Sequence, residues 1–392
     1  MSALAKSIGA RVWSRDGDVD ETGLKGRYDA TMFAAAMALL VLGTLLVFSS
    51  TVRTGLSAKY GHDPFYFLTH HVIHVAAGLI AFWMTIKVPV RWWLKAWPWV
   101  LPISVVLLFG VFFVGESRNG ARRWFSLFGI TLQPSEFVKV GFALYLAGYL
   151  AKRKALVNNL LMGIVPLTIM FVVVAGLLVF QPDVGSVVLL GALVVSMLIV
   201  GGTRFAFMGV LFGLGALALV AILIYDPEKM SRFIGWMMID ETRLGEGFHI
   251  WNSQIVIGSG GLFGEGLGRG LQHVLGYLPE AETDFMFAVA SEEIGFVGVV
   301  CIVLLYVVIA VRGFALIRIC RDDFTRFLAF ALTLLMSLPA LMHMMVGLGL
   351  IPTKGLVLPF MSYGGSALVA EMVTLGLVQR MHLEATRGLG DG

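Results

Sequence analysis

Residues 278–295, LPEAETDFMFAVASEEIG, overlap the start of an apolar run that extends over residues 285–311. This junction decides the fold, because the run that begins at Phe285 is long and apolar enough to cross a lipid bilayer. Asp284 precedes the run, and Glu292 and Glu293 lie within it. Acidic groups at a membrane boundary are costly to keep and are usually functional. We therefore expect a membrane-spanning helix here and chemistry at Asp284.

The whole chain has the composition of a polytopic membrane protein. Of its 392 residues, 58% are hydrophobic and only 14% are charged, and the mean hydropathy is +0.86. A water-soluble domain could not cover its surface with so few polar residues. The formal net charge of +4 is modest, and no basic stripe or nucleic-acid motif accompanies it. We therefore expect no DNA or RNA partner.

Apolar segments of bilayer length recur along the sequence. They predict an all-α, polytopic integral membrane protein with about ten transmembrane helices, at residues 30–49, 68–86, 92–114, 134–151, 158–180, 184–202, 205–224, 285–311, 327–347 and 361–381. We expect one transmembrane domain over 30–382, between terminal tails at 1–29 and 383–392. An even number of spans places both tails on the same side of the membrane.

The short loops on the side of the tails are basic. They hold Lys87, Arg91, Lys95, Lys152, Arg153, Lys154, Arg204, Arg312, Arg318, Arg321 and Arg326. Positive loops stay in the cytoplasm, so both tails are predicted to be cytoplasmic.

The longer connections then fall outside, at 50–67, 115–133, 225–284 and 348–360. The third, of about 60 residues between helices 7 and 8, is too long for a simple linker. These loops carry cations on the side that disfavours them: Arg118, Arg122, Arg123, Arg232, Arg243, Arg269 and Lys354. Such cations indicate an anionic ligand, such as a lipid diphosphate.

Several motifs have a structural interpretation beside the functional one. Glu136 and Lys139 are three residues apart on a helix that starts with proline, where they could form an ion pair inside the membrane or line a polar cavity. SGGLFGEGLGRG, residues 259–270, lacks the lysine and hydroxyl residue of a P-loop. We interpret it as a tight turn or a close backbone approach.

Other polar groups are similarly ambiguous. His70, His71 and His74 include an i, i+4 pair, but no carboxylate or cysteine neighbour completes a metal site, and interfacial anchoring explains them. FMSYGGSAL, residues 360–368, is not a nucleophile elbow, so its serines more plausibly serve packing near a site.

Asp284 itself has a structural alternative. Thr283 and Asp284 could cap the helix that follows them, because both residue types are good N-caps. Glu292 and Glu293 follow about 12–14 Å further along a helix, at about 1.5 Å per residue, and a cap does not explain them. The acids on this one span indicate a polar cavity.

Taken together, the motifs resemble the SEDS family, which includes FtsW and RodA. The resemblance covers about residues 30–382. It is carried by RNGARRW at 118–124, LQPSEFVK at 132–139, FQPDVGS at 180–186, GSGGLFGEGLG at 258–268, LPEAETDFMFAVASEEIG at 278–295 and GLIPTKGLVLPFMSYGGSAL at 349–368. The PTKG form of the last motif looks more like FtsW, the division member, than RodA.

The resemblance implies a peptidoglycan glycosyltransferase that polymerises lipid II into glycan strands outside the cytoplasmic membrane. It also implies a class B penicillin-binding protein as the transpeptidase partner, and other membrane proteins of the divisome. In the family the acidic residue of the TDF motif is essential for polymerisation. In this sequence that residue is Asp284.

A carboxylate can take the proton from an attacking sugar hydroxyl, so Asp284 is the predicted general base. The departing lipid diphosphate needs positive charge, which Arg122, Arg123, Arg243, Lys354 or a divalent cation such as Mg²⁺ or Mn²⁺ could supply. Glu280 and Ser362 are further predicted substrate-binding residues. A helix N-terminus would lower the pKa of Asp284, whereas burial and the neighbouring Glu280 or Glu282 would raise it, and the sequence leaves both outcomes open.

One position departs from the family pattern. Where many relatives have asparagine before PTKG, this chain has His343, for which a contact with a backbone carbonyl is the simplest expectation. Three functions stay open: a polymerase, a lipid II flippase and a non-catalytic division scaffold. Asp284 on the external face favours chemistry there. The polar residues Glu136, Lys139, Glu292 and Glu293 are the features that a flippase would use.

Overall fold

The computed structural model is predominantly helical. It describes residues 27–118, 121–127, 130–270, 278 and 280–387. The longer helices are α2 (Ala30–Gly55), α3 (Tyr66–Lys87), α4 (Val90–Val114), α5 (Pro134–Arg153), α6 (Val165–Phe180), α7 (Val184–Val200), α8 (Phe205–Tyr225), α9 (Pro227–Met237), α10 (Phe248–Ser259), α12 (Met286–Ile319), α13 (Asp323–Gly347) and α14 (Gly365–Arg387). Short helical turns are η1 (Ala58–Tyr60), η2 (Lys154–Leu156) and η3 (Leu160–Ile164).

A helix lies in each of the apolar ranges that the sequence marks as spans. Within the described residues, six helices are long and apolar enough to cross a membrane: α2, α3, α4, α12, α13 and the continuous η3 and α6. The helices α7 and α8 supply shorter apolar stretches. Two further helices, α5 and α14, carry more charge, including Glu136, Lys139 and Glu371. The multi-pass character is therefore confirmed, and the count of ten spans stays a prediction.

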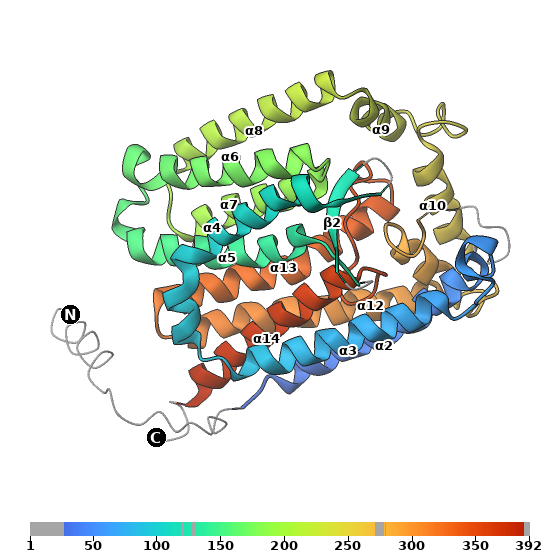
Figure 1. Ribbon diagram of the computed structural model, residues 1–392, viewed down its shortest axis with the longest axis horizontal. Coiled ribbons are helices and arrows are strands. Elements are labelled where there is room, and N and C mark those ends of the chain that lie inside the picture. The colour runs from blue at the N-terminus through green and yellow to red at the C-terminus, as the bar shows by residue number, and fades with distance from the viewer. Residues whose placement is uncertain (1–26, 119–120, 128–129, 271–277, 279, 388–392) are drawn as a thin grey trace.

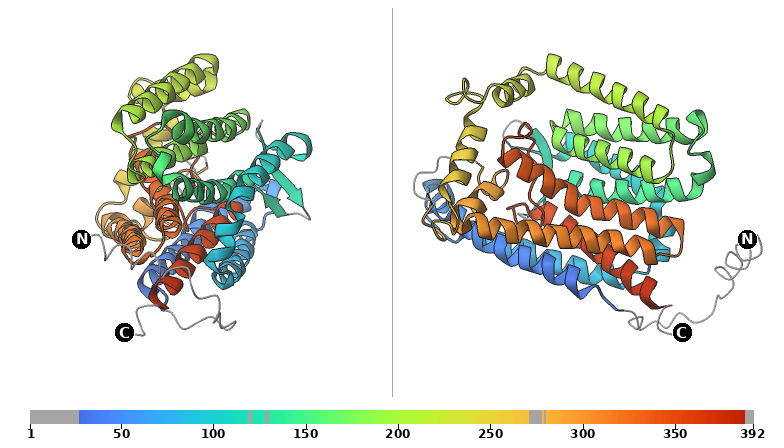
Figure 2. Two further views of the ribbon diagram at one scale, coloured as in Figure 1. Left: turned by 90° about the vertical axis from the view of Figure 1, so that its left-hand side faces the viewer. Right: turned by 180° about the vertical axis from the view of Figure 1, so that it is seen from behind.

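The helices run along a common direction and form an elongated bundle (Figure 1). In the bundle α14 packs against α3, α12 against α2 and α13, and α5 against α4 and α13. The backbone N–H of Arg27 donates to Thr386 Oγ1 at 3.1 Å, so both ends of the described chain meet at one end of the bundle. We call this the termini end and the opposite end the site end. The helices α9 and α10 lie at the site end in both orientations (Figure 2).

The site end also contains a small sheet, which the all-α prediction did not include. Strands β1 (Glu116–Arg118), β2 (Ala121–Leu127) and β3 (Ile130–Leu132) are antiparallel in the order β1-β2-β3. Register pairs include Glu116 with Trp124, and Phe125 with Leu132. Aromatic and β-branched residues in this loop favour extended backbone over helix. Hydropathy windows do not register strands this short.

The helix α12 is interrupted near its start. Gly295 has φ 70° and ψ −175°, a conformation that only glycine adopts readily. The interruption removes the two helical hydrogen bonds that would join the carbonyls of Glu292 and Glu293 to the N–H groups of Phe296 and Val297. Unpaired backbone groups at membrane depth cost several kcal/mol each, on the order of the transfer penalty for a buried amide. The break therefore requires partners from another segment.

The glycine-rich loop 259–270 supplies those partners. The N–H groups of Glu265 and Gly266 donate to the carbonyls of Glu292 and Glu293 at 2.9 and 3.0 Å. Phe296 and Val297 donate in turn to the carbonyls of Gly261 and Leu262 at 2.9 and 3.1 Å. Four groups at the break are thus satisfied, and the glycines at 261, 264, 266 and 268 have positive φ. The predicted close backbone approach is confirmed.

We expect Gly295→Ala to unfold at a distinctly lower temperature than the wild-type protein. A Cβ there would lie 2.2 Å from the Gly264 nitrogen and the backbone conformation would be strained, which together cost at least about 2 kcal/mol. Thermal unfolding in detergent measures the effect. The matched control is Gly176→Ala in α6, where a Cβ meets nothing within 4 Å and helix propensity predicts a small gain. Equal behaviour of the two variants would contradict this role for the break.

Candidate active site

Asp284 lies at the site end, in the turn that leads into α12. The N–H of Asp284 donates to the carbonyl of Glu280 at 2.9 Å, and Glu280 has φ 54°. The N-cap position of α12 belongs to Phe285, whose side chain makes no capping bond. Asp284 therefore does not cap the helix, and its half-buried carboxylate is available for other work.

The segment Leu348–Gly364, which we call the clamp, holds this turn in place. The N–H of Tyr363 donates to the carbonyl of Glu282 at 2.8 Å. The hydroxyl of Ser362 donates to the carbonyl of Thr283 at 2.9 Å and accepts from the N–H of Leu358 at 2.9 Å. Ser362 is only 4% exposed, so it fixes backbone beneath the site surface. The structure thus gives the predicted substrate-binding serine a positioning role.

The same segment brings Lys354 next to Asp284. A Cβ added at Gly355 would lie 3.8 Å from Asp284 Oδ2, so the backbone beside Lys354 passes close to the carboxylate. On its other side the Lys354 carbonyl packs against the start of α7, where a Cβ at Gly185 would lie 2.3 Å from it. Lys354 is half-buried, and this burial lowers the pKa of its ammonium group. The structure thus brings the backbone next to Lys354 close to the carboxylate of Asp284.

Burial determines the titration of Asp284. It raises the pKa of the Asp284 carboxyl to about 6, and the negative charge of Glu280 adds to the rise. Arg232 and the Thr283 hydroxyl act in the opposite direction, and Glu282 adds a smaller rise. The balance that the sequence left open is therefore decided by desolvation. A carboxylate with this pKa is ionised at neutral pH and is a better base than an ordinary aspartate.

Two residues near Asp284 were not predicted as site residues. Arg232 on α9 is the cation whose charge lowers the pKa of Asp284. His249 on α10 stacks on Phe285 with ring centroids 6.3 Å apart, and burial followed by the Arg232 charge lowers the pKa of its imidazole. The helix α9 is tied to the clamp by Trp236, whose indole N–H donates to the Gly349 carbonyl at 2.9 Å. The only signal for Arg232 was its place among the external cations.

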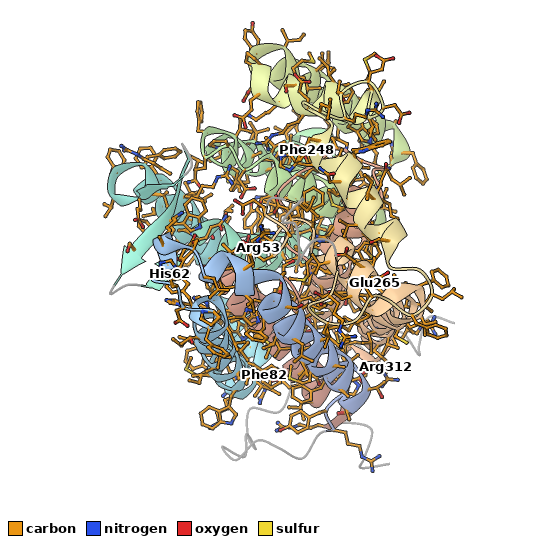
Figure 3. All side chains as sticks on the ribbon, turned by 90° about the vertical axis from the view of Figure 1, so that its right-hand side faces the viewer. Arg53, His62, Phe82, Phe248, Glu265 and Arg312 are labelled. Carbon is orange, nitrogen blue, oxygen red and sulfur yellow. The ribbon has the colours of Figure 1, made fainter. Side chains whose placement is uncertain are left out.

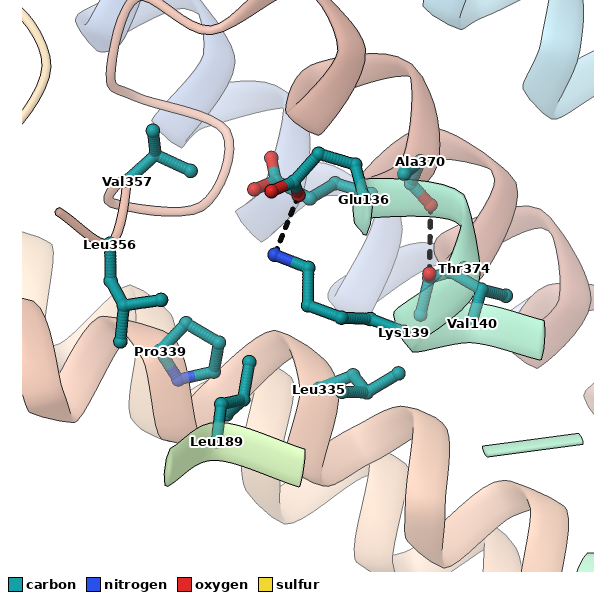
Figure 4. Close-up of a pocket in the computed structure, with 11 residues that line it drawn as sticks. Glu136, Lys139, Val140, Leu189, Leu335, Pro339, Leu356, Val357, Ala370 and Thr374 are labelled. Carbon is teal, nitrogen blue, oxygen red and sulfur yellow. Dashed lines mark hydrogen bonds and ion pairs between the residues drawn. The ribbon is translucent and has the colours of Figure 1, made fainter. Parts of the chain in front are cut away.

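The predicted pair of Glu136 and Lys139 forms, with Nζ to Oε2 at 2.7 Å (Figure 4). It lines a small cavity of about 30 Å³ between α5, α7, α13 and α14. Sequence analysis missed Glu371, a third charged residue in the lining. Glu371 accepts a 2.6 Å hydrogen bond from the N–H of Phe360, in the clamp. The cluster of Glu136, Lys139 and Glu371 thus contacts the clamp through the hydrogen bond between Phe360 and Glu371.

Glu292 and Glu293 do not join this cavity. They are 1% and 2% exposed, and their carboxylates face the glycine-rich loop and α2. Ser259 donates to Glu292 at 3.3 Å, and Ser49 and the N–H of Gly268 donate to Glu293. Glu292 and Glu293 therefore lie apart from the cavity of Glu136 and Lys139, and a polar cavity of their own stays a prediction.

The predicted arginines are spread over the site end. Arg123 donates to the carbonyls of Gln181 and Pro182 at 2.6 and 2.8 Å, which ties β2 to the loop before α7. Arg122 is exposed, with a 3.3 Å contact to the Phe112 carbonyl. Arg243 is also exposed and lies over the Trp251 ring at 5.9 Å. The view onto this end shows Phe248 on α10 and Glu265 in the glycine-rich loop (Figure 3).

His343 bridges two parts of the site from α13. Its Nδ1 lies 2.7 Å from the Leu356 carbonyl, and its Nε2 lies 3.4 Å from the N–H of Phe287. The first contact requires a donor and the second an acceptor, so the ring is neutral with the proton on Nδ1. The expected backbone contact is confirmed, and the second contact links the clamp to the first turn of α12.

A metal site is not evident from the donor set. In the described parts of the chain, no three His, Cys, Asp or Glu side chains are arranged to hold a metal ion. His70 contacts the Tyr66 carbonyl at 2.8 Å, and His71 packs on Tyr363 with ring centroids 6.0 Å apart.

These features define a multi-pass membrane protein with a half-buried carboxylate and a lysine-bearing clamp at one end of its bundle. The family model described as "Cell cycle protein" for FtsW, RodA and SpoVE matches residues 29–387. The chain belongs to this FtsW/RodA/SpoVE family.

Two relatives show how far the likeness extends. The probable peptidoglycan glycosyltransferase FtsW of Alteromonas naphthalenivorans is 35% identical over 93% of this chain and 71% of its own length. The protein of the same name from Trichlorobacter lovleyi is 34% identical over 90% of this chain and 92% of its own length. The suspected family and the closer likeness to FtsW are confirmed.

Solved structures share the fold. A chain from a peptidoglycan synthase complex that coordinates polymerization and crosslinking superposes with a TM-score of 0.72 and 29% identity, over 91% of this chain and 98% of that chain. The rod shape determining protein RodA of Thermus thermophilus gives a TM-score of 0.67 and 29% identity, over 91% and 96% of the two chains.

If Asp284 must be ionised to act, activity should fall as the pH decreases through about 6. Glu280→Gln removes a charge that raises the pKa of Asp284, so the acid limb of the pH profile should move to lower pH. Arg232→Gln removes a charge that lowers this pKa, so the limb should move to higher pH. Initial rates between pH 4.5 and 8 measure both shifts. Shifts in the same direction, or no shift in either variant, would exclude Asp284 as the titrating group.

His343→Ala should lower kcat by about 10- to 100-fold, because the clamp and the first turn of α12 lose their common partner and the reacting groups lose alignment. His343→Asn keeps a donor and an acceptor and should retain much more activity. The acid limb should stay near pH 6 in both variants, since Asp284 is unchanged. A folded His343→Ala protein with wild-type kcat would show that the bridge does not position the site.

Proposed function

We propose that the protein is a peptidoglycan glycosyltransferase of the FtsW type, which polymerises lipid II into glycan strands during bacterial cell division. The observation that carries this proposal is the half-buried carboxylate of Asp284, with its pKa raised to about 6, beside the Lys354 backbone. The names of the relatives support the reaction class, and their FtsW designation supports a role in division.

The proposed setting is the cytoplasmic membrane, crossed by α2, α3, α4, α5, α6, α7, α8, α12, α13 and α14. The termini end carries the basic short loops, so we place it and both tails, 1–29 and 383–392, in the cytoplasm. The transmembrane domain then covers 30–382, and the segment 225–284 with α9 and α10 lies outside. This orientation exposes Asp284 to the leaflet where lipid II is polymerised.

In the proposed reaction Asp284 is the general base. Its carboxylate accepts the proton of the acceptor sugar's 4-hydroxyl while that oxygen attacks the anomeric carbon of the donor glycan. The new bond is the glycosidic C–O bond, and the bond that breaks joins the anomeric carbon to the lipid diphosphate. The diphosphate leaves with the electron pair. Asp284 returns its proton to solvent before the next cycle.

Cations at the site end stabilise the leaving diphosphate. Lys354 lies beside the base, and its half-buried ammonium group would interact strongly with an anion in a site of low dielectric. Arg232 approaches from α9. The exposed Arg122 and Arg243 can guide the anion toward the site, whereas Arg123 already donates to two backbone carbonyls. The negative charge of Glu280 raises the pKa of Asp284, and this proposal assigns Glu280 no direct contact with the substrate.

A lipid II flippase is the second candidate, and the buried cluster of Glu136, Lys139 and Glu371 is the observation in its favour. The cavity that they line measures about 30 Å³. A cavity of this size holds about two water molecules, whereas pockets for drug-sized ligands occupy about 300–1,000 Å³. A disaccharide peptide headgroup cannot pass through it in this conformation. The geometry therefore favours chemistry at the site end over transport.

The proposed partner is a class B penicillin-binding protein that crosslinks the strands, together with other divisome membrane proteins. Support comes from the structural likeness to a chain of a complex that coordinates polymerization and crosslinking. A non-catalytic scaffold would need neither a tuned carboxylate nor cations around it.

Asp284→Asn should reduce polymerisation of purified lipid II by at least about 10²-fold, the lower range for the loss of a positioned base. The amide keeps the shape of the side chain, so folding and partner binding should survive. Glycan strands from the chain co-purified with its transpeptidase partner are measured on gels.

Glu282→Gln is the matched control for this experiment. It changes a neighbouring partly buried acid, whose pKa burial also raises, and it leaves the Glu282 carbonyl that holds Tyr363 in place. This control should keep most of the activity. Near wild-type polymerisation by Asp284→Asn would show that the assignment of the base is wrong.

A further inference from the structure

A second cavity opens at the termini end, far from Asp284. It has a volume of about 270 Å³ and lies between α4, α5 and α6. Three aromatic and two cationic side chains dominate its lining, with Met170 on the α6 side: Trp97, Tyr145, Tyr149, Lys152 and Arg153. None of the described residues that line the cavity carries a carboxylate. This combination of aromatic walls and unopposed positive charge has no part in the proposed reaction.

The aromatic wall is rigid. Trp97 packs directly on α5, where a Cβ at Gly148 would lie 2.3 Å from the indole. Tyr145 lies 5.8 Å from Trp97 and 5.9 Å from Tyr149 between ring centroids. The Tyr149 hydroxyl donates to the Gly163 carbonyl at 2.7 Å, which fixes α5 to the start of α6. The cavity is therefore part of the folded structure.

The cations in the lining are not neutralised within the protein. Arg153 donates through Nη1 to the Met162 carbonyl at 2.8 Å and lies over the Tyr149 ring at 5.2 Å. In the described parts of the chain, neither Lys152 nor Arg153 has a carboxylate within ion-pairing distance. The neighbouring Lys154, by contrast, pairs with Asp323 at 2.9 Å. The charges of Lys152 and Arg153 thus remain available to a ligand, whereas the charge of Lys154 is paired with Asp323.

We propose that this cavity binds the headgroup phosphate of an anionic phospholipid in the leaflet at the termini end. Lys152 and Arg153 bind the phosphodiester, and the aromatic wall surrounds the glycerol, as basic pockets between transmembrane helices do for anionic lipids. The acyl chains lie along exposed apolar side chains of the helices that flank the cavity. Examples are Ile103 on α4, Leu161 on η3 and Ile169 on α6. The proposal depends on the transmembrane arrangement and is independent of the glycosyltransferase chemistry.

Lipid binding to the purified full chain tests the proposal. Native mass spectrometry in a neutral detergent would compare dioleoylphosphatidylglycerol with dioleoylphosphatidylcholine, and glycerol 3-phosphate would serve as a competitor without acyl chains. Lys152→Gln should weaken phosphatidylglycerol binding about fivefold, as expected for one basic side chain at a membrane surface. Met170→Trp fills the cavity without changing charge and should weaken binding at least as much. Lys154→Gln removes the same charge outside the cavity and should have little effect.

Selective phosphatidylglycerol binding that Lys152→Gln and Met170→Trp both reduce, and Lys154→Gln does not, would support the site. Equal binding of phosphatidylcholine would overturn it, because the cations would then contribute no selectivity. Equal losses in Lys152→Gln and Lys154→Gln would also overturn it, since they would show general surface attraction. Displacement of the lipid by equimolar glycerol 3-phosphate would assign the cavity to free phosphates instead of lipid. Lipid II polymerisation by the same three variants is measured in parallel. This measurement distinguishes a loss of lipid binding from a loss of catalytic activity.

Discussion

The structure of the site end depends on the satisfaction of the backbone where α12 is interrupted. A helix that breaks at membrane depth exposes carbonyl and N–H groups, and lipid offers them no partners. Here the loop 259–270 meets all four groups at Gly295 through its own main chain. Gly260, Gly264 and Gly295 allow the two backbones to approach within hydrogen-bonding distance, because a Cβ at any of them would lie 2.0–2.3 Å from a backbone atom of the opposite segment. The short first part of α12 can therefore hold Asp284 at a fixed place.

The chemistry of Asp284 follows from this placement. A carboxylate exposed on a free loop would titrate near its ordinary value and would be a weak base. The turn 280–284 instead sits under the clamp, and burial raises the pKa of Asp284 while Arg232 limits the rise. The result is a group that is ionised at neutral pH and basic enough to accept a proton.

The sequence predicted the parts of this arrangement that depend on local pattern. Apolar length identified the spanning helices, glycine spacing identified the close approach, and the acid before an apolar run identified Asp284. It could not predict that Glu292 and Glu293 face the glycine-rich loop and α2, because their partners Ser259, Gly268 and Ser49 are distant in the sequence. Glu371, an acid within the predicted span 361–381, was not identified, and Arg232 could not be, because its proximity to Asp284 arises only when α9 folds over the site end. The strands around Trp124 were too short for a hydropathy pattern to register.

The polar groups inside the bundle share one structural role, which is to support the clamp. From the sequence alone they could equally have lined a transport path. Glu371 accepts from the N–H of Phe360, His343 contacts the Leu356 carbonyl, and the Tyr306 hydroxyl donates to the Pro359 carbonyl. Each of these contacts satisfies a main-chain group of the clamp, which has no regular secondary structure over residues 352–358. Irregular backbone at this depth requires such partners. The ion pair of Lys139 with Glu136 lines the same small cavity as Glu371. The buried polar groups thus stabilise the segment whose backbone passes beside Asp284.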